Sequence, residues 1–200
     1  MTSKEILAYY DATVDRDVRA DLQRAVELVG EPKIAIDCGC GAGSDIAYLL
    51  ANGFVVHAFD IELASISRCR ERFGDNHRAL LSQASFSSFS YPLASLIVAD
   101  ASFFFCPENE FSTVWEKINT SLMPSGFFVG SFLGPNDTMA GSGFKREAFW
   151  PDVLVFTEVQ LRQTLVGVEI VKWTEHDMDG ETAQGECHHW HIFSVIAKKI

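Results

Sequence analysis

The sequence predicts an α/β fold: a seven-stranded, mostly parallel sheet with an antiparallel last strand and helices on both faces. Short apolar runs alternate with helical patterns along the 200 residues, which is typical of parallel sheets. A glycine-rich turn joins the first run to a helical pattern. The last connector, 175–186, is too short for a crossover that contains a helix, so the final strand is expected to return antiparallel.

Seven strands are expected from short apolar runs bounded by turn residues. Lys33–Asp37 reads as a buried strand, and Pro124-Ser125-Gly126 turns the chain into the fifth. In order, the predicted strands are 33–37, 54–59, 79–82, 94–100, 127–133, 168–174 and 189–198.

The helices follow from apolar residues that recur every three or four positions. In the first, Val18, Leu22, Val26 and Val29 share one face, and Gly30 then ends the helix. In the last, Thr157 and Gln160 form a candidate capping box. The predicted helices are 15–29, 45–51, 62–73, 108–122 and 157–166.

Composition limits the class of protein. Hydrophobic residues make up 48% of the chain, enough for one sizeable core, and one domain over residues 1–200 is expected. Lys and Arg number 16 against 27 Asp and Glu, a net charge of −11. Such an acidic protein repels phosphate backbones, so we expect no nucleic acid partner. No apolar run is long enough to span a bilayer, so no membrane partner is expected.

The cellular compartment is inferred from the N-terminal residues and the cysteines. The first residues include Lys4, Glu5 and Asp11 without a long apolar stretch, so no signal peptide is expected. The five cysteines are odd in number and scattered. They are interpreted as reduced thiols in a cytoplasmic protein.

The glycine-rich turn is the strongest candidate for a binding site. Asp37 is followed by Gly39, Gly41 and Gly43 between a strand and a helix. Glycines there allow close approach to a ligand, and a helix N-terminus offers free N–H groups; a plain tight turn is the alternative. A dinucleotide fingerprint needs glycine where Ser44 stands. The spacing instead favours a ligand with a cationic amino-acid end.

A second acidic residue is predicted to lie beside this turn. Asp60 ends the second strand, 17 residues beyond Gly43. In a βαβ unit an acid at that position accepts hydrogen bonds from both hydroxyls of a ribose. A solvated strand end is the alternative interpretation.

At this point the chain resembles class I S-adenosylmethionine-dependent methyltransferases, which have a Rossmann-like sheet. The resemblance lies in AIDCGCGAGSDIAYLLANGF, VVHAFDIE, LIVADASFFF and SLMPSGFFVGSF. Within that family the chain is similar to bacterial small-molecule enzymes of the tellurite-resistance type, on 9–13, 83–86 and 189–197. The resemblance implies S-adenosylmethionine as cofactor and a small-molecule methyl acceptor.

The resemblance also assigns residues. Asp37, Gly39, Cys40 and Gly41 would line the methionine end of the cofactor, and Asp60 would hold its ribose. Ile61 would pack on the adenine, and Ser85 and Phe86 would flank its edge, where the family often has an acid. Ala99 would lie near the sulfonium. Arg16 and Arg19 are interpreted as helix-surface charges, with the cofactor carboxylate as an alternative partner.

Methyl transfer is an in-line displacement, so a base is needed only for an acceptor that binds protonated. Asp100 at the end of the fourth strand is one candidate, with a solvated turn acid as the alternative. His189 and His191 share one face of the last strand and are the other candidates, with packing beside Trp190 as the alternative. No metal site is expected, although Cys187-His188-His189-x-His191 contains metal-binding residue types.

Further expectations concern the organisation of the chain, its oligomeric state and other possible functions. Residues 1–30 are expected to form a helical cap, and Gly134–Pro151 is predicted to be a glycine-punctuated lid over the substrate. The protein is expected to be a monomer or homodimer. Two other functions stay open: a nicotinamide-dependent oxidoreductase and a non-catalytic S-adenosylmethionine-binding protein.

Overall fold

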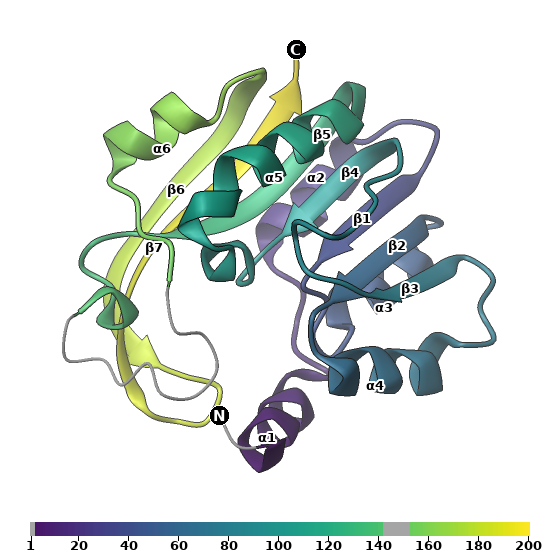
Figure 1. The fold of residues 1–200 in the computed structure, drawn as a ribbon, viewed down its shortest axis with the longest axis horizontal. Coiled ribbons are helices and arrows are strands. Elements are labelled where there is room, and N and C mark those ends of the chain that lie inside the picture. The colour runs from purple at the N-terminus through teal and green to yellow at the C-terminus, as the bar shows by residue number, and fades with distance from the viewer. Residues whose placement is uncertain (1–2, 142–152) are drawn as a thin grey trace.

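The sheet of the computed structural model, which describes residues 3–141 and 153–200, has seven strands in the order β3-β2-β1-β4-β5-β7-β6 (Figure 1). Strands β1 to β5 run parallel, and β7 pairs antiparallel with both β5 and β6. The predicted fold class is therefore confirmed. The strands are β1 (Ile34–Cys38), β2 (Val55–Asp60), β3 (Ala79–Gln83), β4 (Ala94–Ala99), β5 (Leu122–Leu133), β6 (Val168–Glu181) and β7 (Cys187–Lys199).

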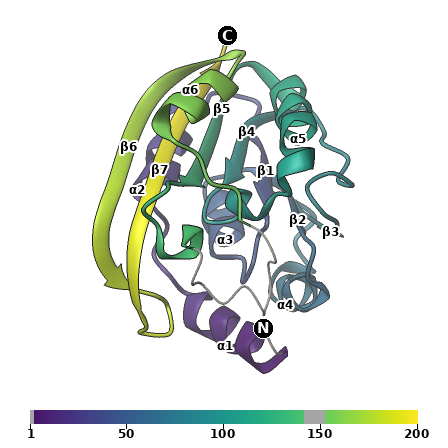
Figure 2. The ribbon, with the colours of Figure 1, turned by 60° about the vertical axis from the view of Figure 1, so that its left-hand side comes forward.

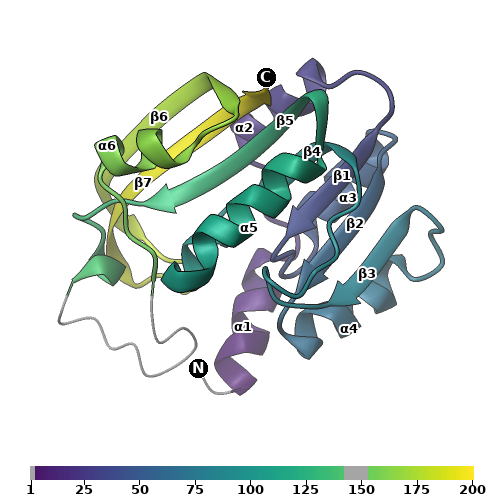
Figure 3. The same ribbon diagram turned by 45° about the horizontal axis from the view of Figure 1, so that its top comes forward.

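Helices cover both faces of the sheet (Figures 2 and 3). One core cluster packs α2, α3 and α4 against the sheet, and a second packs α5 and α6 against the opposite face. The helices are α1 (Ser3–Thr13), α2 (Ala20–Leu28), α3 (Ser44–Ala51), α4 (Leu63–Phe73), α5 (Glu108–Ser121) and α6 (Glu158–Thr164), with short 3₁₀ turns η1 (Phe103–Phe105) and η2 (Thr138–Ala140). In the described part of the chain, none of them is long and apolar enough to cross a membrane.

Local sequence explains most of these boundaries. All six residues of β4 are buried, as expected for a central parallel strand covered on both faces. The predicted capping box is present, because the Thr157 side chain accepts from Gln160 N and Gln160 caps the Thr157 N–H. The helix predicted from Asp15 begins only at Ala20, because Arg19 has an extended backbone and serves as its N-cap residue.

The prediction that residues 175–186 form a connector is wrong for most of this segment. Strand β6 continues to Glu181, so only 182–186 remain between β6 and β7. Acidic residues at alternate positions lie on one face of this strand, and the backbone pairs with β7 along the whole segment. The other face carries His176, Met178 and Gly180, so the segment lacks the regular apolar alternation that marks a strand.

The β6–β7 hairpin extends beyond the sheet. Strand β5 pairs with β7 only as far as Leu133 opposite Ile192, whereas β6 and β7 continue to Glu181 opposite Cys187. Figure 2 shows the hairpin turn and α1 on the side where the parallel strands end. Ligands of open α/β sheets bind at that edge, so the hairpin and α1 flank the candidate site.

Candidate active site

The three glycines of the turn after β1 have left-handed backbone conformations, with φ of +75° at Gly39, +51° at Gly41 and +84° at Gly43. Gly39 and Gly43 are required by packing. A Cβ at Gly39 would lie 2.7 Å from Ser102 Cβ, and one at Gly43 would lie 2.8 Å from the Phe73 ring. A Cβ at Gly41 would meet only Tyr10 Cε1, at 4.0 Å. The open side of the turn is therefore at Gly41, beneath α1.

The N–H groups of the turn are largely used within the protein, which differs from the expectation of free donors. Gly39 N and Cys40 N donate to Phe59 O at 2.8 and 3.0 Å. Gly41 N donates to Asp60 Oδ2 at 2.9 Å. These bonds fix the turn against the end of β2, so a ligand meets a preformed surface.

Asp60 is buried at the end of β2 and is held by two backbone donors. Its Oδ2 accepts from Gly41 N and its Oδ1 from Glu62 N, each at 2.9 Å. Burial raises the pKa of this carboxyl, against the opposing effect of these hydrogen bonds. The acid predicted to lie beside the glycine turn is in contact with it.

The rear of the turn is anchored to α4. Ser65 Oγ donates to Gly41 O at 2.7 Å, and Cys69 Sγ lies 3.6 Å from the same oxygen. Cys40 is buried and its Sγ lies 3.7 Å from Ser65 Oγ. The Cys40 side chain thus packs toward the helix as a small apolar group.

Asp37 carries an unusual polar atom. Its Oδ2 is the one sealed side-chain nitrogen or oxygen in the described part of the chain without a hydrogen-bond partner. Burial, followed by the charges of Asp45 and Cys69, raises the pKa of Asp37 well above its usual range. An unpaired buried carboxyl oxygen is costly, and a donor or cation brought by a ligand would satisfy it. This fits the α-amino group of the predicted cofactor.

Two arginines bring positive charge to the same edge. Arg16 Nε donates to Ser44 Oγ at 3.1 Å, and its Nη2 lies 3.3 Å from Asp45 Oδ2. Arg19 Nε lies 2.7 Å from Asp100 Oδ2. Asp100, the predicted catalytic acid at the end of β4, is thus a largely buried carboxylate paired with an arginine whose side chain is 47% exposed.

The residues assigned to the adenine lie beyond β2 and β3. Ile61 is 48% exposed, and Gln83 Nε2 donates to its carbonyl at 3.1 Å. Phe86 packs edge-on against Phe59 at 5.7 Å between ring centroids. The Ser85 hydroxyl is occupied by the neighbouring serines 87 and 88. Ile61 therefore offers an apolar surface next to Asp60, whereas the Ser85 hydroxyl already has partners.

On the other side of the turn, an apolar wall follows the ends of β4 and β5. Ala99 is fully buried and pairs with Gly130 of β5. Ala101 has a φ of +50°, and its N–H donates to Ser131 Oγ at 2.7 Å. We call the following group the apolar wall: Phe104, Leu133 and Ile192, with Ala101, Phe105, Met139, Val155 and Trp190 packed against them.

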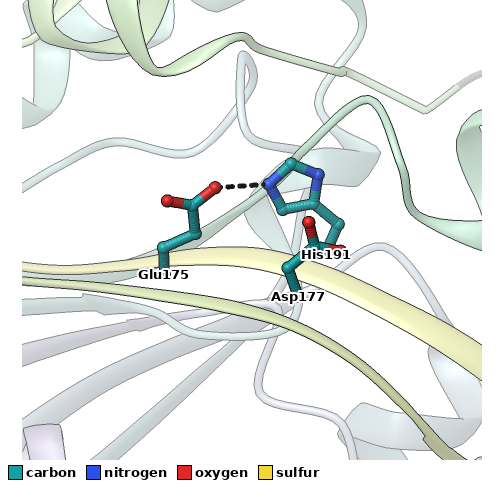
Figure 4. Close-up of side chains that lie close together, drawn as sticks. All are labelled: Glu175, Asp177 and His191. Carbon is teal, nitrogen blue, oxygen red and sulfur yellow. Dashed lines mark hydrogen bonds and ion pairs between the residues drawn. The ribbon is translucent and has the colours of Figure 1, made fainter.

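His191 lies on β7 opposite Asp177 of β6, and Glu175 lies two residues away from Asp177 on the same strand (Figure 4). Its Nδ1 accepts from Asn136 N at 3.1 Å, so the neutral ring carries its proton on Nε2 and donates it to Glu175 Oε1 at 2.9 Å. The three side chains hold possible metal-ligand atoms within 4.8 Å of one another. A metal on Nε2 would require that nitrogen without its proton, in conflict with the Asn136 donor.

His189 is also engaged at both ring nitrogens. Its Nδ1 lies 2.7 Å from Asp179 Oδ1 and its Nε2 lies 2.7 Å from Asp177 Oδ1. These hydrogen bonds raise the pKa of His189, since both acids favour the charged ring. The two histidines share a face, as predicted, but neither presents an unpaired nitrogen.

The sequence predicts no catalytic role for His188, the third histidine of β7. Its Nε2 lies 3.0 Å from Oδ1 of Asp137, a buried residue of the loop after β5. Asp137 also accepts from Met139 N and His191 N. No signal in the sequence joins the two residues, because they are 51 positions apart.

The predicted lid, Gly134–Pro151, lies only in part within the described residues, because 142–152 fall outside them. Residues 134–141 run beside β7. Gly134 N donates to His191 O at 2.7 Å, and Thr138 Oγ1 accepts from His189 N at 2.8 Å. This described portion is therefore attached to the hairpin.

Comparison with known protein families gives a match that spans the turn. Residues 35–126 match the model of a family described as a methyltransferase domain. The matched segment includes the glycine turn, Asp60 and the end of β4. This match agrees with the family predicted from the sequence motifs over the segment that it covers. A search of curated protein sequences finds no match.

Three solved structures illustrate the likeness in fold. TehB from Haemophilus influenzae has a TM-score of 0.71 at 15% identity; the match covers 92% of this chain and 63% of TehB, so this chain spans less than two thirds of that protein. The second is 1,6-didemethyltoxoflavin-N1-methyltransferase from Burkholderia thailandensis with bound 1,6-didemethyltoxoflavin and S-adenosylhomocysteine. Its TM-score is 0.66 at 21% identity, and the match covers 98% of this chain and 86% of that protein. The third is N-methyltransferase NodS from Bradyrhizobium japonicum in complex with S-adenosylhomocysteine. Its TM-score is 0.70 at 15% identity, and the match covers 98% of this chain and 97% of that protein.

Proposed function

We propose that this chain, which belongs to the class I S-adenosylmethionine-dependent methyltransferases, transfers a methyl group from S-adenosylmethionine to a small-molecule acceptor. The observation that carries the proposal is the bond from Gly41 N to Asp60 Oδ2 beside the open face of Gly41. It joins a preformed glycine surface to a buried acid at the carboxyl edge of a parallel sheet, where ligands of such sheets bind.

The residues present fit the chemical groups of this cofactor. Asp37 Oδ2 would accept from the α-amino group, which would end its lack of a partner. Asp60 would accept from the ribose hydroxyls, and Ile61 would lie against the adenine. Arg16 or Arg19 would pair with the carboxylate, since both guanidinium groups lie near the turn and already pair with acids there.

The reaction asks little covalent chemistry of the protein. The cofactor, when bound, supplies a methyl group already activated on sulfur. The protein holds the acceptor in line with that methyl and excludes water. We assign the alignment of the acceptor to the apolar wall, which begins two residues after the end of β4. Asp100 beside Arg19 is a buried negative charge near the same strand end and would favour the positive sulfur.

The electrostatics favour a neutral or cationic acceptor. The chain carries a net charge of −11, and the hairpin adds Glu175, Asp177, Asp179 and Glu181 along one strand. Polyanionic acceptors and nucleic acid would be repelled. We propose that the protein works as a monomer or homodimer in the cytoplasm. Its buried cysteines, among them Cys40 and Cys69, are free thiols, in keeping with a reducing compartment.

Two experiments test the proposal. Calorimetry with S-adenosylhomocysteine should show specific binding, tighter than binding of NAD or NADP. A panel of metabolites incubated with methyl-labelled S-adenosylmethionine should then show transfer to at least one small molecule. Tighter binding of a nicotinamide dinucleotide would favour an oxidoreductase instead. Binding without transfer to any acceptor would favour a non-catalytic binding protein.

A further inference from the structure

We propose that Asp137 and His188 form a proton-accepting dyad for the acceptor, with Nδ1 of His188 as the base. The inference rests on the proposed methyltransferase function and adds a catalytic residue to it. It also assigns the acceptor to a chemical class: a molecule that binds with a proton on its nucleophilic oxygen, nitrogen or sulfur.

The hydrogen bonds define which nitrogen of His188 carries the proton. Asp137 Oδ1 lies 3.0 Å from His188 Nε2, and a carboxylate can only accept. Nε2 therefore donates, and in the neutral ring Nδ1 keeps its lone pair. Asp137 is itself fixed, because it is 2% exposed and accepts from the backbone N–H groups of Met139 and His191.

The lone pair on Nδ1 is available. Among the described residues, no hydrogen-bond partner of this atom is found, and the one sealed side-chain atom without a partner is Asp37 Oδ2. The His188 residue as a whole is 7% exposed. The other two histidines of β7 differ, since both nitrogens of His189 and His191 are engaged.

The position of His188 places the dyad on the acceptor side of the site. The His188 ring packs on Trp190, with centroids 3.9 Å apart and an interplanar angle of 33°. Trp190 in turn packs against the apolar wall, which includes Ala101 immediately beyond the end of β4. A chain of packed side chains thus connects the strand end nearest the predicted sulfonium with the imidazole. Across the hairpin, the partner of His188 is the uncharged Gly180.

The proton on the acceptor's nucleophilic atom moves to His188 Nδ1. The electron pair left on that atom forms the new bond to the methyl carbon. The bond from methyl carbon to sulfur breaks, and its electron pair stays on sulfur as a thioether. Asp137 stabilises the imidazolium, which then releases its proton to water. Asp137 is a positioning residue, because it acts only through His188.

The following variants distinguish loss of the basic nitrogen from loss of the folded structure. In His188→Gln the side-chain amide can still donate to Asp137 in place of Nε2, while the basic nitrogen is lost. Asp137→Ala removes the acceptor of the Nε2 proton, so the tautomer of His188 is no longer fixed and the form protonated at Nδ1 should become populated. His176→Gln is the matched control, since His176 is an exposed histidine on the same hairpin.

Nitrogen-15 NMR tests the dyad without any acceptor. The wild-type protein should show neutral His188 protonated at Nε2, and Asp137→Ala should show a larger share of the form protonated at Nδ1. A wild-type ring protonated at Nδ1 would overturn the proposal. Circular dichroism checks that each variant is folded, and the His188→Gln spectrum keeps the test open if Asp137→Ala fails to fold.

Turnover is then measured at neutral pH with whichever of 2-naphthol and benzyl mercaptan the wild type methylates faster, because both bind with the nucleophilic atom protonated. In His188→Gln, kcat should fall by about 100-fold or more, the usual contribution of a general base. Its affinity for S-adenosylhomocysteine should stay within about twofold of wild type, as should the kcat of His176→Gln. Normal turnover in His188→Gln would overturn the dyad alone. Failure of the wild type to bind S-adenosylhomocysteine would instead refute the methyltransferase proposal.

Discussion

Gly41 and Asp60 are joined by a 2.9 Å hydrogen bond from the glycine N–H to carboxylate Oδ2. The turn after β1 and the end of β2 therefore hold each other in place. A ribose bound to Asp60 would meet a carboxylate whose orientation is fixed beforehand, since Glu62 N holds the other oxygen. Preorganisation of this kind lowers the entropy that binding must overcome.

Replacement of this acid should weaken cofactor binding. Asp60→Ala removes charge-assisted hydrogen bonds to two ribose hydroxyls, and we expect a loss of about 1.5–3 kcal/mol in the affinity for S-adenosylhomocysteine. Calorimetry measures the loss. The control is Asp75→Ala, an exposed acid beyond α4, which should bind as wild type does. Equal affinities for the two variants would remove Asp60 from the site.

Gly41→Val should abolish binding of S-adenosylhomocysteine. The valine would occupy the open face of the turn and would also impose a left-handed conformation that costs about 1–3 kcal/mol. Gly30→Val is the matched control, because a Cβ at Gly30 meets nothing within 4 Å. Thermal unfolding of both variants shows whether the fold persists. A folded Gly41→Val protein with normal affinity would contradict the site.

The arginines should recognise only the amino-acid end of the ligand. Arg16→Gln and Arg19→Gln should each weaken the binding of S-adenosylhomocysteine by about tenfold, or about 1.4 kcal/mol. Both should bind 5′-methylthioadenosine, which lacks that end, as wild type does. Arg24→Gln serves as control, since Arg24 is an exposed residue of α2 paired with Glu27. A parallel loss for both ligands would indicate a general structural effect.

The buried Asp37 should make stability depend on pH. Because burial raises its pKa, the folded state favours the protonated form. Its contribution to stability is complete below the unfolded carboxyl pKa of about 3.9 and is lost as pH rises through the raised value. Asp37→Asn should therefore melt about 2–4 °C above wild type at pH 8. The difference should vanish near pH 4.

The same variant should bind S-adenosylhomocysteine more weakly, because an amide attracts the α-amino group less than a carboxylate does. Melting curves across pH 4–8 and calorimetry at pH 7 measure the two effects on one protein. A melting difference that does not change with pH would show that Asp37 is not the group responsible.

The parts of the site predicted from the sequence are the local ones. Asp37 and the glycine turn lie within seven residues, and Asp60 follows at the end of the next strand, so spacing alone brings them together. The period of apolar residues also gave the order of strands and helices, because burial on one face or on both leaves a regular pattern.

The parts that escaped prediction depend on contacts between distant segments or on strands without an apolar face. Segment 175–181 reads as a polar connector, yet it pairs with β7 throughout. His189 and His191 were selected for sharing a face, a correct inference that says nothing of what each nitrogen contacts. Asp137 and His188 meet only after β7 lies against β5, and no spacing rule reports that meeting.

Because β7 lies between β5 and β6 in the sheet, the order in which the protein can fold during its synthesis is constrained. While a ribosome is still adding the residues before Cys187, nascent β6 has no strand to pair with, because its sheet neighbour is β7. Strands β1 to β5 can already pair with one another at that stage. Strands β1 to β5, which carry the candidate cofactor site, can thus pair on the emerging chain. The β6–β7 hairpin with His188 can form only after the C-terminal strand has been synthesised. Until then the exposed edges of β5 and β6 are sites where a chaperone or another nascent chain can bind.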